Sequence, residues 1–125
     1  MMLTLHPDTY AVCRLDPTAD MPFWAFSAQV VSVTRTAGEL SVVCREDLAP
    51  PGVRAEKSWR CLEVVGPLDF SLVGVMAQLS DILARASISI FVVSTYDTDL
   101  IFVREEDVEE AIYVLSRSGH AVRRD

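Results

Sequence analysis

The sequence has little of what most enzymes and nucleic-acid-binding proteins require. It contains only two histidines, His6 and His120, at opposite ends of the chain. It has no Gly-x-Ser-x-Gly elbow, no phosphate-binding glycine loop and no His-Glu-x-x-His motif. Eighteen acidic against eleven basic residues give a formal net charge of -7, which repels a phosphate backbone. We therefore expect no enzymatic activity, no catalytic residues, no metal, no cofactor and no nucleic-acid partner.

Long apolar runs and a leader segment are also missing. No stretch reaches the roughly 18 unbroken apolar residues of a membrane span, and residues 1–7 lack the basic and apolar regions of a signal peptide. We expect no membrane partner and a cytoplasmic location. The three cysteines, Cys13, Cys44 and Cys61, are widely spaced in apolar sequence. This pattern predicts reduced core thiols rather than disulfides or metal ligands.

The clearest secondary-structure pattern lies in the second half of the chain. Half of all residues are hydrophobic, which is enough for one compact domain or two small half-domains. Apolar residues recur at helical spacing at Val75, Leu79, Ile82, Leu83 and Ala86. A second helix is expected after the acidic run 105–107, and strands are expected at residues 59–65, 88–93, 100–103 and 120–123. The order predicts an α+β fold of the ferredoxin-like βαββαβ type, with two helices on one face of a four-stranded antiparallel sheet.

The first half is less regular. Strands are expected at residues 10–15, 29–34 and 40–45, an apolar patch at 22–26 takes the place of a first helix, and residues 46–48 can form only a turn or two. On element order alone, we interpret residues 1–52 as a degenerate copy of the unit in residues 53–125.

The run Ser94-Thr95-Tyr96-Asp97-Thr98-Asp99 gathers hydroxyl, aromatic and carboxylate groups between two apolar strands. Such a cluster at a hairpin indicates a small-molecule site. An alternative is that Asp97 and Asp99 only stabilise a tight turn through bonds to the local backbone, while Tyr96 packs at a strand end.

Several segments of the second half resemble the ACT domain. They read FSLVGVMA at residues 70–77, LS at 79–80, ILA at 82–84 and ISIFVVSTYDTD at 88–99. More narrowly, they are similar to the small tandem-ACT proteins related to the arginine-sensing CASTOR proteins. The resemblance covers residues 60–123 and is weak in the first half. Where this chain has Ala86-Ser87, the family usually has Gly or Asn at the end of the helix. Because Ser tolerates a left-handed conformation poorly, we expect this helix end to differ in detail.

The resemblance implies a regulatory, non-catalytic domain that holds a free amino acid at an interface between two ACT units. Gly74, near a helix start, would let backbone N–H groups approach the ligand carboxylate. Asp99 would pair with the ligand ammonium, while Thr95 and Tyr96 would offer hydrogen bonds and an aromatic wall. An alternative is that Gly74 only permits close helix–sheet packing. The predicted ligand-binding residues are Asp69, Phe70, Ser71, Leu72, Val73, Gly74, Thr95, Tyr96 and Asp99.

Two functions of different classes follow. The first is an amino-acid sensor whose ligand changes an interface, either in a homodimer or with a regulated partner protein. The second is a ligand-independent interaction or oligomerisation module that pairs through its exposed sheet edges.

Overall fold

The structure is a computed structural model that describes residues 1–66, 68 and 73–125, and the chain divides into two compact units. Unit 1 consists of Met1–Pro7 and Arg60–Asp125, and unit 2 of Asp8–Trp59. These limits differ from the predicted ranges 1–52 and 53–125, because two long strands each run from one unit into the other. The interpretation of the first half as a degenerate copy of the second stays a prediction.

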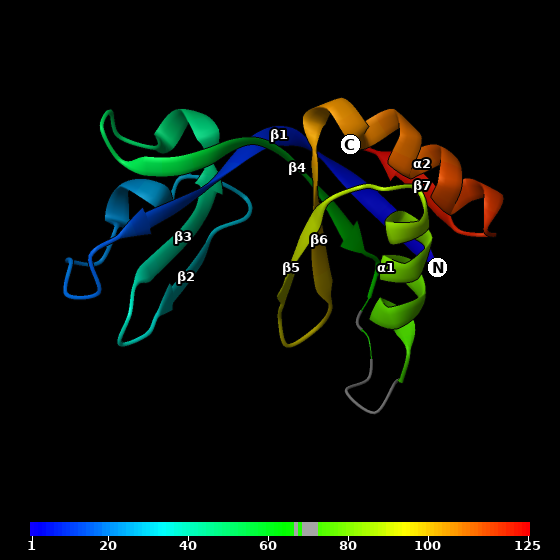
Figure 1. The fold of residues 1–125 in the computed structure, drawn as a ribbon, viewed down its shortest axis with the longest axis horizontal. Helices are drawn as coiled ribbons and strands as arrows, with labels where there is room; N and C mark the ends of the chain where they lie inside the picture. Colours follow the sequence, from blue (N-terminus) through cyan, green and yellow to red (C-terminus); the bar gives the residue numbers. More distant parts are fainter. Residues whose placement is uncertain (67, 69–72) are drawn as a thin grey trace. The chain divides into compact units, whose positions relative to one another are not determined.

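Unit 1 has the element order predicted from the sequence (Figure 1). Its helices and strands follow one another as β-α-β-β-α-β, with one extra 3-10 turn, η3, before the second helix. The elements are β4 (Arg54–Val64), α1 (Val75–Arg85), β5 (Ile90–Ser94), β6 (Asp99–Arg104), η3 (Glu105–Asp107), α2 (Val108–Arg117) and β7 (Ala121–Arg124). The ferredoxin-like α+β fold expected for the second half is therefore confirmed.

The sheet of unit 1 corrects one detail of that prediction. Its strand order is β7-β1-β4-β6-β5, so the beginning of β1 (Met2–Leu15) lies between β7 and β4. Met2 pairs with Ala121 in parallel register, and the Val65 N–H donates to the Met2 carbonyl at 2.8 Å. The predicted four-stranded antiparallel sheet was wrong, because the start of β1 adds a fifth strand and pairs in parallel with β7. This strand was missed in the sequence, where Pro7 interrupts the run of strand-forming residues.

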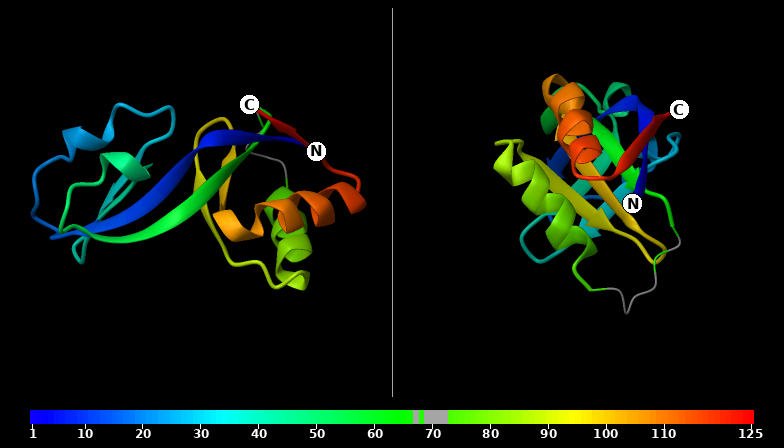
Figure 2. Two further views of the ribbon diagram at one scale, coloured as in Figure 1. Left: turned by 90° about the horizontal axis from the view of Figure 1, so that it is seen from above. Right: turned by 90° about the vertical axis from the view of Figure 1, so that its right-hand side faces the viewer.

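Both helices of unit 1 cover the same face of its sheet (Figure 2). Apolar residues that alternate along the strands meet the apolar stripes of the helices in one buried cluster. The cluster contains Leu3, Leu5, Leu62, Val64, Leu79, Leu83, Ile88, Ile101, Val103, Val108, Ala111 and Leu115. This packing holds α1 and α2 against the strands that carry the polar hairpin.

Unit 2 is built on the second part of β1, which pairs antiparallel with β3 (Leu40–Arg45), while β3 pairs with β2 (Ser32–Arg35). The predicted strand at 40–45 is confirmed, and the one at 10–15 is the end of the much longer β1. The apolar patch at 22–26 forms a single 3-10 turn, η1 (Phe23–Ala25), and a second turn, η2 (Glu46–Leu48), follows β3. One buried cluster of this unit contains Ala11, Cys13, Ala25, Leu40, Val42 and Cys44.

The two helices end in the same way, although different residues carry the turn. After α1, Ser87 has φ 60°, and the Ile88 N–H donates to the Leu83 carbonyl at 3.0 Å. After α2, Gly119 has φ 92°, and the His120 N–H donates to the Leu115 carbonyl at 3.0 Å. Both are Schellman motifs, in which the left-handed residue allows the next N–H to reach back into the helix. Ser87 thus adopts the left-handed conformation that serine tolerates poorly, and whether this helix end differs from that of other family members stays a prediction.

This comparison predicts that Ser87→Gly stabilises the protein. A serine with a left-handed backbone carries steric strain that glycine lacks, so we expect the free energy of unfolding to rise by about 1 kcal/mol. The measurement is urea unfolding followed by circular dichroism. Gly119→Ser is the reciprocal control and should lower stability by a similar amount. Equal stability of Ser87→Gly and the unsubstituted protein would contradict the prediction.

The cysteines are free and buried, as predicted. Cys61 is fully buried, and its burial, together with the nearby Glu63 carboxylate, raises the pKa of the thiol to about 12. Because the thiolate is the reactive form, a buried neutral thiol is inert at ordinary pH. Because all three thiols are buried and out of reach of a reagent, we expect none of them to react with a disulfide reagent at about pH 8 until the protein is unfolded. Rapid reaction of the folded protein would show that the thiols are accessible.

Candidate functional site

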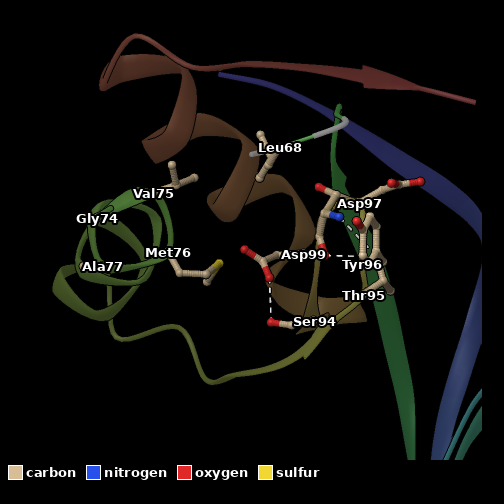
Figure 3. Close-up of a pocket in the computed structure, with 11 residues that line it drawn as sticks. Leu68, Gly74, Val75, Met76, Ala77, Ser94, Thr95, Tyr96, Asp97 and Asp99 are labelled. Atoms are coloured by element: carbon tan, nitrogen blue, oxygen red, sulfur yellow. Dashed lines mark hydrogen bonds between the residues drawn. The ribbon is translucent and has the colours of Figure 1, made fainter. Parts of the chain in front are cut away.

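A cavity of about 310 Å³ lies within unit 1, between the first turn of α1 and the β5–β6 hairpin (Figure 3). Its size is at the lower end of the range for small-ligand sites. The described residues that line it are Leu68, Gly74, Val75, Met76, Ala77, Ser94, Thr95, Tyr96, Asp97, Thr98 and Asp99. The polar run singled out in the sequence thus forms one wall of the cavity.

Two threonines close the turn of the hairpin. The Thr95 N–H donates to the Thr98 carbonyl at 2.8 Å, and the Thr98 N–H donates to the Thr95 hydroxyl at 3.2 Å. The Thr95 hydroxyl donates to the Thr98 carbonyl at 3.1 Å. These bonds stabilise the turn. The alternative interpretation of the sequence had assigned that role to the carboxylates of Asp97 and Asp99.

Asp99 points into the cavity, toward Met76 on α1 (Figure 3). It lies opposite Ser94 in the β5–β6 register, and the Ser94 hydroxyl donates to Asp99 Oδ1 at 2.6 Å. Along β6, Ile101 and Val103 belong to the core beneath the helices. Because alternate strand residues share a face, Asp99 is directed to the helix side of the sheet. Its carboxylate keeps further acceptor positions beyond the one that Ser94 occupies.

The first turn of α1 forms the opposite wall. Gly74 is the N-cap, with φ 88°, and its carbonyl accepts a hydrogen bond from the Gln78 N–H at 2.9 Å. The first N–H groups of an α-helix have no carbonyl partner within the helix, and they form its positive end. A Cβ on Gly74 would meet no atom of the described residues within 4 Å. Glycine is therefore required here by the left-handed backbone rather than by close helix–sheet packing.

The structure brings four of the predicted site residues together: Gly74, Thr95, Tyr96 and Asp99 all line the cavity. Val73 does not line it and is 94% exposed. The other predicted residues, Asp69, Phe70, Ser71 and Leu72, lie outside the described residues.

Several lining residues were not predicted as ligand-binding. Ser94, Asp97 and Thr98 were part of the noted polar run, and the register of the hairpin shows why Ser94 accompanies Asp99. Val75 was noted as a helix residue, and Met76 only as part of the segment FSLVGVMA that resembles the ACT domain. Their place in the wall depends on where α1 begins relative to the hairpin, which helical periodicity does not specify.

The fold and the cavity define unit 1 as a small α+β domain of ferredoxin-like topology with a polar pocket beside one hairpin. The chain belongs to the ACT domain family, whose model matches residues 54–117. A second family model, described as an N-terminal domain, matches residues 8–51, which lie within unit 2.

Three known proteins illustrate the relationship. The cytosolic arginine sensor for mTORC1 subunit 1 of Homo sapiens is 38% identical over 60 residues, which are 47% of this chain and only 18% of that protein. The crystal structure of a protein from Agobacterium tumefaciens is 35% identical with a TM-score of 0.93, covering 99% of this chain and 92% of that one. The ligand-free regulatory subunit of aspartate kinase from Thermus thermophilus has a TM-score of 0.64 at 14% identity, covering 92% and 95% of the two chains. This last likeness shows the fold alone.

Among the residues that the structure describes, no helix is both long enough and apolar enough to cross a lipid bilayer.

Proposed function

We propose that the cavity of unit 1 binds a free amino acid and that this binding regulates an interaction of the protein. One observation carries the proposal: a carboxylate and the positive end of a helix line the same small cavity from opposite sides. An amino acid has an ammonium group and a carboxylate only two bonds apart along its backbone. A site with complementary charges on its opposite walls suits that pair of groups.

The ligand carboxylate is placed at the first turn of α1, where the left-handed Gly74 leaves the backbone N–H groups open to approach. The ligand ammonium is placed at Asp99, whose second carboxylate oxygen is not the one bonded to Ser94. Thr95 already uses its hydroxyl inside the hairpin, so its contribution is the shape of the wall. Tyr96, at the rim, adds aromatic surface.

The charge of the lining favours some amino acids over others. Of the described lining residues, two are carboxylates, Asp97 and Asp99, and none carries a positive charge. A ligand with an acidic side chain would meet repulsion in such a site. Leu68, Val75 and Met76 offer apolar contact to an aliphatic side chain. Because the human relative is an arginine sensor, arginine is the first ligand to test.

The surface beside the cavity supports a regulated contact. Tyr96 is 81% exposed and lines the cavity, and Val73, which precedes Gly74, is 94% exposed. These exposed apolar side chains beside the cavity are available for contact with a partner. We propose that a second copy of the ACT unit covers the cavity, so that the ligand lies at an ACT–ACT interface and changes what a partner protein contacts. The role is binding rather than catalysis.

The proposal predicts that Asp99→Asn weakens arginine binding. A charge-assisted hydrogen bond contributes about 1.5–3 kcal/mol, so we expect the dissociation constant to rise by about 10- to 100-fold. Isothermal titration calorimetry measures it directly. Asp81→Asn is a matched control, because this exposed aspartate on α1 pairs with Arg85 and does not line the cavity.

A thermal-shift screen with each of the common amino acids tests the ligand class. A ligand present at about 100 times its dissociation constant stabilises the folded state by about 2.7 kcal/mol, which raises the melting temperature measurably. No shift with any amino acid up to millimolar concentration would contradict the proposal and favour the ligand-independent interaction module. Equal binding by Asp99→Asn and the unsubstituted protein would reject the role of Asp99.

A further inference from the structure

Thr98 lines the cavity, yet its polar groups are all engaged in holding the hairpin in place. Among the described residues it is one of four buried polar or charged ones, with 9% of its surface exposed. Its N–H and carbonyl bond to Thr95 across the turn. Its hydroxyl donates to the Val64 carbonyl at 2.6 Å. Val64 is the last residue of β4, so this side-chain bond ties the hairpin to the strand from which the chain leaves toward α1.

A second tie lies next to the first. The Leu68 N–H donates to the Asp97 carbonyl at 2.6 Å, so the chain that leaves β4 folds back against the hairpin. Gly66 lies between these groups. A Cβ there would come within 2.9 Å of the Leu68 nitrogen, 3.0 Å of the Asp97 oxygen and 3.4 Å of the Thr98 Cβ. The Leu68 nitrogen and the Asp97 oxygen are backbone atoms, and they cannot move aside without breaking the hydrogen bond that joins them.

These ties matter for the cavity because its walls come from segments that are distant in sequence. The core cluster holds α1 through Leu79 and Leu83. The hairpin wall is held by the pairing of β6 with β4 and, at its tip next to Asp99, by the bonds of Thr98 and Asp97. A site that must match the fixed length of a zwitterion tolerates little change in the separation of its walls.

We propose that Thr98 is a positioning residue for the ligand site: its hydroxyl bond to Val64, with the close contact at Gly66, sets the distance between the Asp99 carboxylate and the first turn of α1. The inference rests on the proposed function. Thr98 does not itself bind the ligand. Its hydroxyl donates to the Val64 carbonyl, and its N–H and carbonyl bond to Thr95.

The test compares four variants with L-arginine as the probe. Thr98→Val keeps the shape of the side chain and removes the hydroxyl, and Thr98→Ser restores it. Gly66→Ala disturbs the same place without removing a polar group. Thr4→Val is the matched control, because Thr4 is a buried threonine of the same unit, 7% exposed, whose hydroxyl accepts a hydrogen bond from Arg123 Nε at 2.9 Å.

We expect Thr98→Val and Gly66→Ala to raise the dissociation constant for arginine by about tenfold or more, since small displacements of positioned groups cost large factors. Thr98→Ser should stay within about threefold of the unsubstituted protein, because the hydroxyl is kept. Thr4→Val should lose a similar amount of stability as Thr98→Val but bind arginine normally. Equal affinities of Thr98→Val and Thr4→Val would overturn the proposal.

Amide hydrogen exchange gives a readout that needs no ligand. In Thr98→Val we expect the Leu68 amide to exchange about tenfold faster, while the amide of Ile101 in the core stays protected. If the unsubstituted protein binds no amino acid, the proposed function fails, and this exchange measurement still decides whether Thr98 holds the two walls together. Unchanged protection of Leu68 would reject the positioning role. Should Thr98→Val fail to fold, Gly66→Ala provides the same comparison.

Discussion

Burial of the apolar stripe of α1 against the sheet of unit 1 is the constraint from which the site follows. Leu79 and Leu83 are fully buried in the cluster that contains Leu62 and Ile101. Each buried leucine contributes about 1.5–3 kcal/mol, so the position of the helix along the sheet is strongly specified. The first turn of the helix is thereby held beside the β5–β6 hairpin. The cavity lies where the hairpin extends beyond the buried cluster. At that end its residues 94–99 are polar and line the cavity.

The polar groups of the hairpin divide into two sets with different tasks. Thr95 and Thr98 form hydrogen bonds with each other across the turn, and the Thr98 hydroxyl also bonds to the last residue of β4. Ser94 and Asp99 pair across the strands on the helix side, where the carboxylate faces the cavity. A run of six polar-capable residues therefore both braces the hairpin and lines the cavity. Because of this division, the chemical type of a residue in the run does not tell whether it stabilises the hairpin or faces the cavity.

Much of unit 1 could be predicted because its signals are local. The spacing of apolar residues from Val75 to Ala86 indicated α1, and the β-branched and aromatic run before Ser94 indicated β5. The left-handed conformation of Ser87 could not be predicted, because it goes against the propensity of serine and precedes a residue, Ile88, that is buried in the core. The N-terminal strand was missed for a different reason. Its pairing with β7 joins residues more than a hundred positions apart, and no local pattern reports such a pairing.

By itself, the sequence determined the order of helices and strands in the second half, the buried state of the cysteines and the polar character of one hairpin. These properties depend on the periodicity and chemistry of neighbouring residues. Only the tertiary structure decided that the start of β1 joins the sheet of the second half. It also decided that Gly74 and Asp99 border one cavity, and that the Thr98 hydroxyl bonds to the end of β4. Such relations depend on which distant segments the core brings together, because burial specifies their separation in space and local sequence does not.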